Sequence, residues 1–380
     1  MINKYINRQI EPLVAKNLFK GDVVILYGAR QVGKTTLVRQ ILEKNSEVPS
    51  KYINCDEGDV QKIFSEAETS VALKKITGDA RLVVLDEAQR IRNIGSKLKL
   101  LVDNFPDQQI IATGSSSFDL ANEIVEPLTG RSREFWLYPF SAAEMFADGS
   151  EMDFNRELES LLVFGSYPLV FTSNANEDKK LQLEKIASNY LYKDVLKFQN
   201  LKNFETVRKL LEALALQIGN EVSYTELGSL IGVSKQTVES YVDILEKAFI
   251  VFKIRPFSRN LRKELSKLRK IYFYDLGIRN ALINNLNPLS IRGDVGALWE
   301  NFVVADKRKQ SNFIGNQTPL YFWRTYDGQE VDLVEERDGR LFGHEIKWTK
   351  ARKKPPALWT KSYPDASWEV ISRENFLSGR

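Results

Sequence analysis

The residues that could do chemistry first gather between positions 28 and 35, where the chain reads GARQVGKT. Gly28 and Gly33 flank four residues, and Lys34 and Thr35 follow the second glycine. Glycines at such places let backbone amides turn toward phosphate oxygens, while the lysine reaches the β and γ phosphates of a nucleotide. The next hydroxyl is a ligand for Mg²⁺. The pattern predicts a site for ATP and Mg²⁺, with a chance glycine turn before a helix as the alternative.

Elements of the required kind bound this loop. Asp22 to Tyr27 reads DVVILY, an apolar run of β-forming residues that suits a parallel strand buried on both faces. A helical pattern, TLVRQILEK, follows the loop. We therefore expect ATP to be bound by one continuous stretch: Gly28, Ala29, Arg30, Gln31, Val32, Gly33, Lys34, Thr35 and Thr36.

A second apolar strand, Leu82 to Leu85, ends in a pair of carboxylates. Asp86 is expected to hold the Mg²⁺ through water, and Glu87, one residue further, to polarise an attacking water as general base. The same DEAQ sequence is also typical of helicases. We disfavour a helicase, because such a motor needs a second nucleotide-binding lobe with arginine-bearing motifs, and the remaining chain does not read as one.

A third predicted strand, Gln109 to Ala112, leads into the hydroxyl-rich segment TGSSS. Thr113 and Ser115 are candidates to sense the γ phosphate of ATP from the end of this strand. The alternative is that these hydroxyls form an ordinary cap between a strand and a helix.

A further group of acidic and basic residues lies near the end of the chain. Glu330 and Asp332 stand two apart on one predicted strand, and Glu345 and Lys347 stand two apart on the next. Side chains two apart share a face of a strand, and a hairpin can bring both pairs together. Glu300, in a predicted helix, would add another carboxylate.

This C-terminal group resembles the site of PD-(D/E)xK nucleases, although valine replaces the leading proline. Asp332, Glu345 and Glu300 would then bind Mg²⁺ or Mn²⁺, and Lys347 would orient or deprotonate water and stabilise developing charge. The alternative is a pair of solvated acids on an exposed strand. His344, the only histidine, is expected to pack on the apolar face of its strand rather than to act in catalysis.

Three helical patterns between positions 204 and 247 have the spacing of a helix-turn-helix, and the strand-like FIVFKIRP follows as a wing. Val238, Val242 and Leu245 repeat at helical spacing and predict the buried face of the third helix. The outward residues are of types that read DNA, namely Lys235, Gln236, Thr237 and Ser240. The alternative is a winged helix that serves only for packing.

Basic residues gather behind the predicted wing. The segment from 253 to 270 contains one acid, Glu264, and eight basic residues: Lys253, Arg255, Arg259, Arg262, Lys263, Lys267, Arg269 and Lys270. The first 200 residues contain 25 basic and 28 acidic residues, whereas the remaining 180 contain 29 and 22. Contact with phosphates of DNA is therefore expected in the second half.

Composition excludes several other classes of protein. A chain of 380 residues with 43% hydrophobic and 27% charged residues forms two or three folded domains rather than a disordered protein. A single cysteine cannot form an internal disulfide or a four-cysteine zinc site. The polar start and the lack of long apolar runs predict a cytoplasmic protein without a membrane partner.

Several motifs together resemble one family of bacterial and archaeal AAA-type P-loop ATPases. They are YGARQVGKTTLVRQ, VVLDEAQR, IIATGSSS, LTGRSREFWLYPFSAAE and YFYDLGIRNAL, and the similarity covers nearly the whole chain. In this family the C-terminal part is known only as a domain of unknown function. The resemblance implies that Gly130 and Arg131 close the ATPase core, so Arg131 is a candidate arginine finger or sensor, with Arg133 a weaker one. A finger acting in trans would require a homo-oligomer.

We therefore predict an α/β protein with an AAA-like P-loop NTPase core on a parallel sheet over residues 1–140. A helical connector is expected over 141–200, a winged helix over 201–260 and a restriction-nuclease-like α/β domain over 261–380. The predicted function is a Mg²⁺-dependent ATPase that couples ATP hydrolysis to DNA. The rival is a nucleotide-switched DNA- or protein-binding module whose nuclease fold is inactive.

Overall fold

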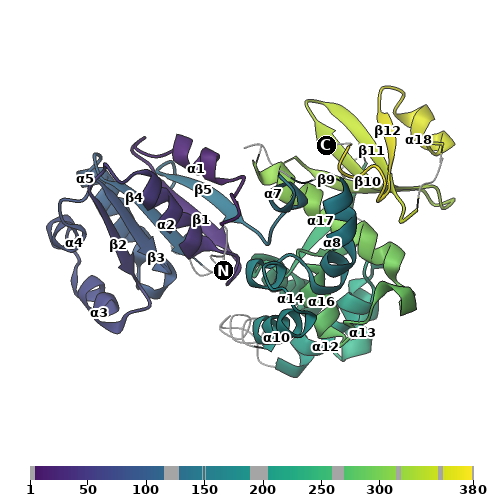
Figure 1. Cartoon of the computed structure of the whole chain (residues 1–380), viewed down its shortest axis with the longest axis horizontal. Helices are drawn as coiled ribbons and strands as arrows, with labels where there is room; N and C mark the ends of the chain where they lie inside the picture. The colour runs from purple at the N-terminus through teal and green to yellow at the C-terminus, as the bar shows by residue number, and fades with distance from the viewer. Residues whose placement is uncertain are drawn as a thin grey trace. The chain divides into compact units, whose positions relative to one another are not determined.

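A computed structural model of the chain describes residues 5–114, 128–147, 149, 151–188, 204–258, 269–313, 318–349 and 354–378. Two compact units make up the chain (Figure 1). The smaller contains Met1–Tyr138 with Lys247–Phe249, and the larger contains Pro139–Glu246 with Ile250–Arg380. The larger unit thus contains nearly all of the predicted connector, winged helix and C-terminal domain, which the sequence analysis separates at residues 200 and 260.

The smaller unit is built on a five-stranded parallel sheet in the order β2-β3-β4-β1-β5. β1, β3 and β4 are buried at every position, so the prediction of buried parallel strands is confirmed. Parallel pairing brings the carboxyl ends of neighbouring strands to one edge of the sheet. The strands are β1 (Val23–Gly28), β2 (Ser50–Asn54), β3 (Leu82–Asp86), β4 (Gln109–Gly114) and β5 (Ser132–Leu137).

Helices connect these strands. The element that matters most for the site is α2, which begins directly after Gly33, a residue in the left-handed region at φ 95°. Gly28 is required for a different reason, because a Cβ atom there would lie 2.3 Å from the carbonyl oxygen of Leu137. The helices are α1 (Glu11–Lys16), α2 (Lys34–Lys44), α3 (Gly58–Glu66), α4 (Ser70–Thr77), η1 (Ala88–Arg90) and α5 (Ile94–Asn104).

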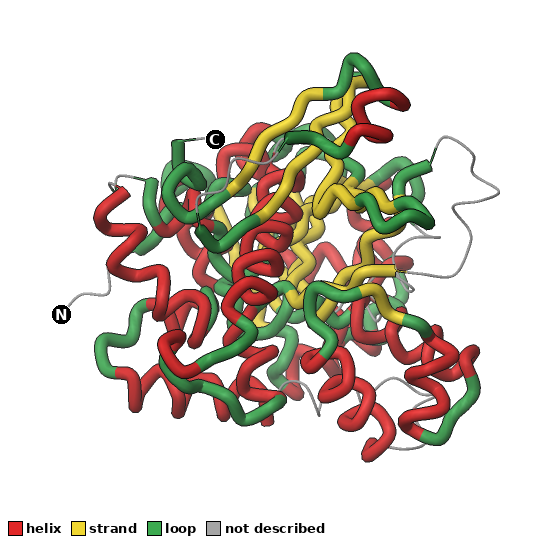
Figure 2. The backbone as a smooth tube through the Cα atoms, turned by 90° about the vertical axis from the view of Figure 1, so that its right-hand side faces the viewer, coloured by secondary structure: helices red, strands yellow, loops and turns green. Residues whose placement is uncertain are grey.

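The larger unit is rich in helices, and Figure 2 distinguishes them in red from the yellow strands. No described helix combines the length and the apolar character needed to cross a membrane. The helices are α7 (Ala142–Met145), α8 (Glu151–Phe164), α9 (Pro168–Phe171), α10 (Asn176–Ile186), α12 (Phe204–Leu216), α13 (Tyr224–Ile231), α14 (Lys235–Lys247), α16 (Leu276–Leu282), η3 (Leu289–Ile291), α17 (Val295–Phe313) and α18 (Ala357–Ser362).

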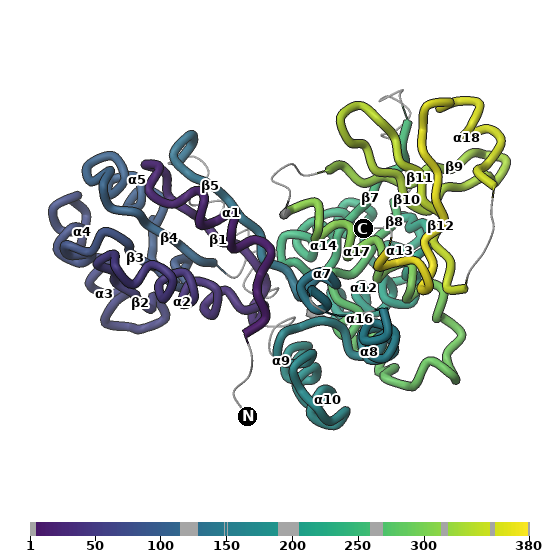
Figure 3. The backbone as a smooth tube through the Cα atoms, turned by 45° about the horizontal axis from the view of Figure 1, so that its top comes forward, coloured from purple at the N-terminus to yellow at the C-terminus, as the bar shows by residue number. Residues whose placement is uncertain are grey.

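One seven-stranded sheet runs through the larger unit in the order β12-β11-β10-β9-β7-β8-β6. β7 pairs with β8 in antiparallel and with β9 in parallel fashion, so the predicted wing strand is also part of the C-terminal sheet. Figure 3 traces its C-terminal strands beside α18. The strands are β6 (Glu221–Val222), β7 (Val251–Pro256), β8 (Arg269–Phe273), β9 (Leu320–Arg324), β10 (Glu330–Arg337), β11 (Arg340–Ile346) and β12 (Ser367–Ile371).

A buried polar junction joins α8 and α16 in this unit. The Asp275 carboxylate caps α16 by accepting from the Ile278 amide at 3.1 Å, and it also accepts from the Ser166 amide at 2.7 Å. Asn280 donates to the backbone carbonyls that end α8, at 2.9 Å each. The YFYDLGIRNAL motif therefore contributes here to folding, because buried polar groups are stable only when paired.

Candidate functional site

The loop between β1 and α2 wraps around the ammonium group of Lys34, which is 4% exposed. Its Nζ donates to the carbonyl oxygens of Gly28 at 2.9 Å and Ala29 at 3.0 Å, and lies 3.8 Å from Oε1 of Glu87. Arg30, Gln31, Val32 and Gly33 complete the loop, and Thr35 and Thr36 lie in the first turn of α2. The predicted nucleotide-binding residues thus form a single loop and helix start.

Sequence reasoning missed a residue that supports this loop. The guanidinium of Arg8 is buried and donates to the carbonyl oxygens of Val32 at 2.8 Å and Tyr138 at 2.6 Å. It therefore ties the middle of the phosphate loop to the chain that follows β5. A lone arginine near the start of a sequence carries no local signal of such a contact.

The carboxylate of Asp86 is the point where four elements of the smaller unit meet. Its Oδ2 accepts from the hydroxyl of Thr35 at 2.7 Å and from that of Tyr52 at 2.6 Å, while Oδ1 accepts from Thr113. Burial, followed by the hydrogen bond to Asp86, raises the pKa of Tyr52 to about 12. Tyr52 was not predicted, and its position on β2, paired in parallel with β3, is what brings it here.

Glu87 stands directly after β3 in the left-handed region, at φ 56° and ψ 42°. Its backbone amide donates to Oγ1 of Thr113 at 3.0 Å, and its Oε2 accepts from Nε2 of Gln89 at 2.6 Å. The carboxylate is thus oriented by neighbours and lies on the same side as Lys34.

Thr113 is fully buried, and its hydroxyl donates its one hydrogen bond to Asp86. A hydroxyl in that arrangement orients Asp86 and Glu87, and cannot donate to a phosphate at the same time. Ser115, the second predicted sensor, lies outside the described residues.

Arg131 lies at the opposite edge of the sheet from the phosphate loop. Its carbonyl oxygen accepts from the amide of Val23, at the start of β1, and its Nε lies 2.6 Å from Oδ1 of Asp103. Arg133 similarly pairs with Asp22 at 2.8 Å. Both arginines lie near the start of β1, whereas the phosphate loop begins at Gly28, where β1 ends. Neither arginine therefore reaches the loop of its own chain, and this geometry does not support a role for Arg131 as a sensor in cis.

The residues present fit Mg²⁺ beside the phosphate loop. The side-chain oxygens of Thr35 and Asp86 lie 2.7 Å apart, and both are of the kind that coordinates a metal. Magnesium prefers oxygen ligands and keeps several of its waters. When bound with ATP, the ion would neutralise charge on the β and γ phosphates.

The C-terminal residues also come together in the larger unit. β10 and β11 form the predicted antiparallel hairpin, and Nζ of Lys347 lies 2.8 Å from Oε1 of Glu345 and 3.3 Å from Oδ2 of Asp332. The amide of Ile346 donates to the same oxygen of Asp332 at 2.8 Å. Burial, with the neighbouring Glu345 adding to it, raises the pKa of Asp332.

Strand alternation does not hold along the whole of β10. The register against β9 shifts between Val331 and Val334, and both valines pack in one apolar cluster with Trp359. A β-bulge inserts one extra residue, which changes the face on which later side chains lie. Simple alternation therefore does not continue through this part of β10.

A second lysine, Lys270, lies next to these carboxylates. In the sequence it is counted among the basic residues at 253–270. Lys270 on β8 is 3% exposed, and its Nζ lies 3.1 Å from Oε1 of Glu300 and 2.8 Å from Oε1 of Glu330. The hydroxyl of Tyr272 donates to the same oxygen of Glu300 at 2.7 Å. We refer to Lys270, Tyr272, Glu300, Glu330, Asp332, Glu345 and Lys347 as the carboxylate cluster.

The carboxylate cluster does not fit a divalent metal in this arrangement. Among the described residues, no group of three or more carboxylates, histidines or cysteines is arranged to hold a metal ion. Ammonium groups instead lie against the carboxylates, because Lys270 contacts Glu300 and Glu330, while Lys347 contacts Asp332 and Glu345. The negative charge of the acids is thus balanced by cations of the chain itself.

His344 is buried, as expected, but it does not pack on an apolar face. Its Nε2 lies 2.9 Å from Oε1 of Glu335, and its Nδ1 lies 2.8 Å from Oε1 of Glu369. Burial alone would lower the pKa of His344, but the two glutamates outweigh it and raise the pKa above its ordinary value. The pKa of Glu335 falls to about 2, because His344 and Lys307 outweigh its burial.

The third predicted helix is α14, capped where Oγ of Ser234 accepts from the amide of Thr237 at 3.1 Å. Val238, Val242 and Leu245 are buried as predicted, while Lys235, Gln236 and Ser240 are exposed and Thr237 is partly buried.

The basic run behind α14 is less accessible than its composition suggests. Lys253 pairs with Asp243 at 2.5 Å and with Glu246 at 2.8 Å, and Lys270 is buried in the carboxylate cluster. Lys270 is therefore not accessible to phosphate, whereas Lys253 is partly exposed and paired with two acids of α14. Arg255 is exposed, Arg269 lies over the ring of Tyr224 at 5.5 Å, and residues 259–268 lie outside the described part of the chain.

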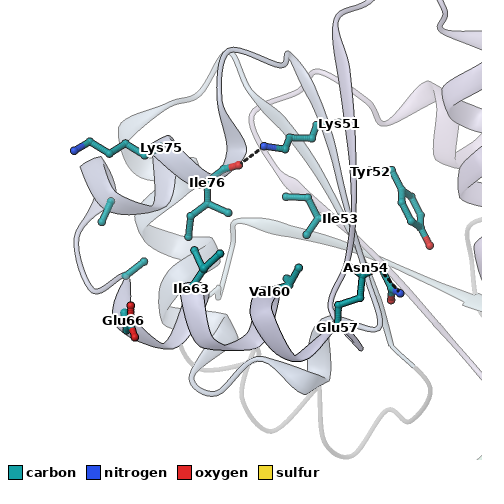
Figure 4. Close-up of a pocket in the computed structure, with 12 residues that line it drawn as sticks. Lys51, Tyr52, Ile53, Asn54, Glu57, Val60, Ile63, Glu66, Lys75 and Ile76 are labelled. Carbon is teal, nitrogen blue, oxygen red and sulfur yellow. Dashed lines mark hydrogen bonds between the residues drawn. The ribbon is translucent and has the colours of Figure 1, made fainter.

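A groove of about 660 Å³ lies beside the edge strand β2 rather than at the phosphate loop (Figure 4). Ile53, Val60, Ile63 and Ile76 point into it, while Lys51 donates to the carbonyl oxygen of Ile76 at 2.6 Å across one end. Because its lining is mainly apolar, this groove is not where the chemistry described above takes place.

Comparison with known proteins assigns three consecutive parts of the chain. An AAA domain matches residues 20–146, a domain of unknown function (DUF8612) residues 155–289 and another (DUF4143) residues 295–366. The solved Walker-type ATPase paby2304 of Pyrococcus abyssi is similar over 74% of this chain and 97% of its own, with a TM-score of 0.50 and 15% identity. Fold and site thus define an AAA-type P-loop ATPase with a C-terminal DUF4143 domain.

Proteins of other organisms are similar to this chain over most of its length. The uncharacterized protein Rv2008c of Mycobacterium tuberculosis is 30% identical over 335 residues, which cover 87% of this chain and 71% of the relative. The uncharacterized protein MJ1544 of Methanocaldococcus jannaschii is 24% identical, over 87% and 75% of the two chains. The chain belongs to the same family as the mycobacterial protein.

The surroundings of His344 predict a pH dependence of stability. A raised histidine pKa stabilises the fold fully below the ordinary value of about 6.5, and this contribution disappears as pH rises through the folded pKa. The lowered pKa of Glu335 stabilises above its ordinary value of 4.5 and is lost as pH falls toward about 2. His344→Gln should therefore cost more unfolding free energy at pH 6 than at pH 9, measured by urea unfolding.

Because the chain has one histidine, its imidazole can also be titrated directly by NMR in protein prepared without a histidine tag. A midpoint above about 6.5 is expected. A midpoint at or below that value would contradict the assigned ion pairs.

Proposed function

We propose that this protein is a Mg²⁺-dependent ATP hydrolase that couples its nucleotide cycle to a DNA-directed winged helix next to a nuclease-like fold. The observation that carries the hydrolase assignment is the convergence of Lys34, Thr35, Asp86 and Glu87 at one edge of a parallel sheet. Lys34 would contact the β and γ phosphates. Glu87, oriented by Gln89, would position the attacking water and accept its proton.

DNA binding is proposed for the element order α12-β6-α13-α14-β7-β8, which is that of a winged helix. α13 ends at Gly232 in the left-handed region, and a Cβ atom at Gly228 would lie 2.6 Å from the carbonyl oxygen of Val233, so the turn is tight. The exposed side chains Lys235, Gln236 and Ser240 would then face a groove of duplex DNA. Glu239, also exposed on α14, opposes phosphate and limits affinity.

Arg131 enters this proposal only through a second copy of the chain. Within one chain it lies beside the start of β1, whereas the phosphate loop follows the end of that strand. A finger role would therefore require an oligomer in which Arg131 leaves Asp103 and reaches the nucleotide of a neighbouring protomer.

A second candidate is a nucleotide-switched binding module whose nuclease fold is inactive. The specific observation in its favour is that each carboxylate of the cluster lies against an ammonium group, from Lys270 or Lys347. Paired in this way, Asp332 and Glu345 hold lysine rather than a metal. ATP would then control binding to DNA or to a protein without any cleavage.

Two substitutions separate ATP binding from ATP turnover. Lys34→Ala should weaken nucleotide binding, because the phosphates lose their ammonium partner. Glu87→Gln should retain ATP and lose turnover by roughly 100-fold or more, since a positioned base contributes about that much. Phosphate release with Mg²⁺ measures turnover, and calorimetry measures binding. Glu68→Gln, an exposed acid of the same unit, serves as the control. Full turnover in Glu87→Gln would remove Glu87 as the base.

Charge reversal tests the DNA-directed helix. Lys235→Glu combined with Gln236→Glu should lower affinity for a labelled duplex by about 10-fold or more at low salt and reduce its salt dependence. Reversal of Arg262, Lys263 and Lys267, outside the described residues, should do the same. Lys180→Glu, at an exposed position of α10, is the control for a change of charge away from α14. Fluorescence anisotropy that shows equal affinity in all variants would favour a winged helix used only for packing.

Cleavage of supercoiled plasmid distinguishes an active nuclease fold from an inactive one. An active site would nick DNA with Mg²⁺ or Mn²⁺, with or without ATP, and would lose this activity in Asp332→Ala while ATP turnover stays intact, because distant sites act independently. Lys347→Ala should then slow cleavage. The second candidate predicts no nicking under any of these conditions, so nicking that depends on Asp332 would contradict it.

A further inference from the structure

The carboxylate cluster brings four acids of the larger unit into one partly buried group. Two of them, Asp332 and Glu345, share Lys347, whose side chain is 37% exposed. The other two, Glu300 and Glu330, share Lys270, which is 3% exposed. The two ammonium groups thus divide the acids into pairs, one around a buried lysine and one around a partly exposed lysine.

Lys270 is placed as an internal counter-ion rather than as a surface base. It sits on β8 and reaches over β7 and β9 to Glu330 on β10, with Nζ 5.8 Å from the ring centre of Phe322. Glu300 approaches from α17 and is also bonded by Tyr272. An ammonium group enclosed by two carboxylates and an aromatic ring has little room for solvent, so it stays with its partners.

The lysine also comes from a different part of the chain than the acids. Glu300, Glu330, Asp332 and Glu345 all fall within the DUF4143 match at residues 295–366, whereas Lys270 falls within the DUF8612 match at residues 155–289. The neighbouring segment therefore supplies the cation to the acids of the C-terminal domain. Pairing of β7 with β9 fixes the two segments in one sheet.

We propose that Lys270 takes the place of a divalent cation in the carboxylate cluster, and that its ammonium group keeps metal out of the native chain. Hard divalent ions such as magnesium and calcium bind oxygen ligands at about 2.0 to 2.6 Å, with carboxylates that are free to coordinate them among these ligands. Two of the available carboxylates are already bonded to Lys270. Removal of this one charge leaves Glu300 and Glu330 without their shared counter-ion, close to Asp332, and creates a site for a hard divalent ion.

This inference rests on the second candidate function, the one with an inactive nuclease fold, but it is tested without any activity. Mn²⁺ binding to the full chain without nucleotide is measured by electron paramagnetic resonance. The native chain should show no binding that depends on Asp332. Lys270→Met should bind Mn²⁺ at least 10-fold more tightly than the native chain, and Lys270→Met with Asp332→Ala should lose the added binding. Lys270→Arg, which keeps the charge, should behave as the native chain.

Thermal unfolding provides the second measurement. Lys270→Met should melt below the native chain and regain stability when Mn²⁺ is added, whereas the melting of the native chain should not change. If Lys270→Met folds only when Mn²⁺ is present, the ion has replaced the ammonium group and the proposal stands. Folding without metal binding, or failure to fold at any Mn²⁺ concentration, overturns it. Native binding of Mn²⁺ that is lost in Asp332→Ala overturns it as well, whether or not ATP is hydrolysed.

Discussion

The carboxylate of Asp86 is the interaction on which the nucleotide site depends. It accepts hydrogen bonds from hydroxyl groups on α2, β2 and β4. Thr113, which donates one of these bonds, also accepts a hydrogen bond from the backbone amide of Glu87. These contacts are possible only because parallel strands end together at one edge. Thr35, Tyr52, Thr113 and the start of Glu87 are therefore positioned around one buried group, and a shift of any of these strands would disturb all of them.

In the larger unit, too, buried charged side chains hold elements together by pairing with one another or with backbone amides. Arg279 donates to Asp294 at 2.6 Å, Asp275 accepts from two backbone amides, and His344 lies between two glutamates. Each of these groups would be costly in a protein interior without its partner. The buried charges of the YFYDLGIRNAL motif thus contribute to folding, independently of whether the carboxylate cluster performs chemistry.

The sequence predicts local features well and long-range partners poorly. The strands before Gly28 and Asp86, and the helix that begins at Lys34, follow from apolar runs and spacing within a few residues. The partners of Asp86 and Glu330 lie on strands whose order in the sheet is not encoded locally, so Tyr52 and Lys270 could not be placed. The bulge in β10 likewise defeats simple alternation, because one extra residue leaves no signal in composition.

The shared seven-stranded sheet bears on how this chain can evolve. The DUF8612 match ends at residue 289 and the DUF4143 match begins at 295, yet β7 of the first is hydrogen-bonded to β9 of the second. An exchange of either segment by recombination would have to supply a complementary edge strand, or leave unpaired backbone groups exposed to aggregation. The two segments are therefore expected to be inherited as one folding unit.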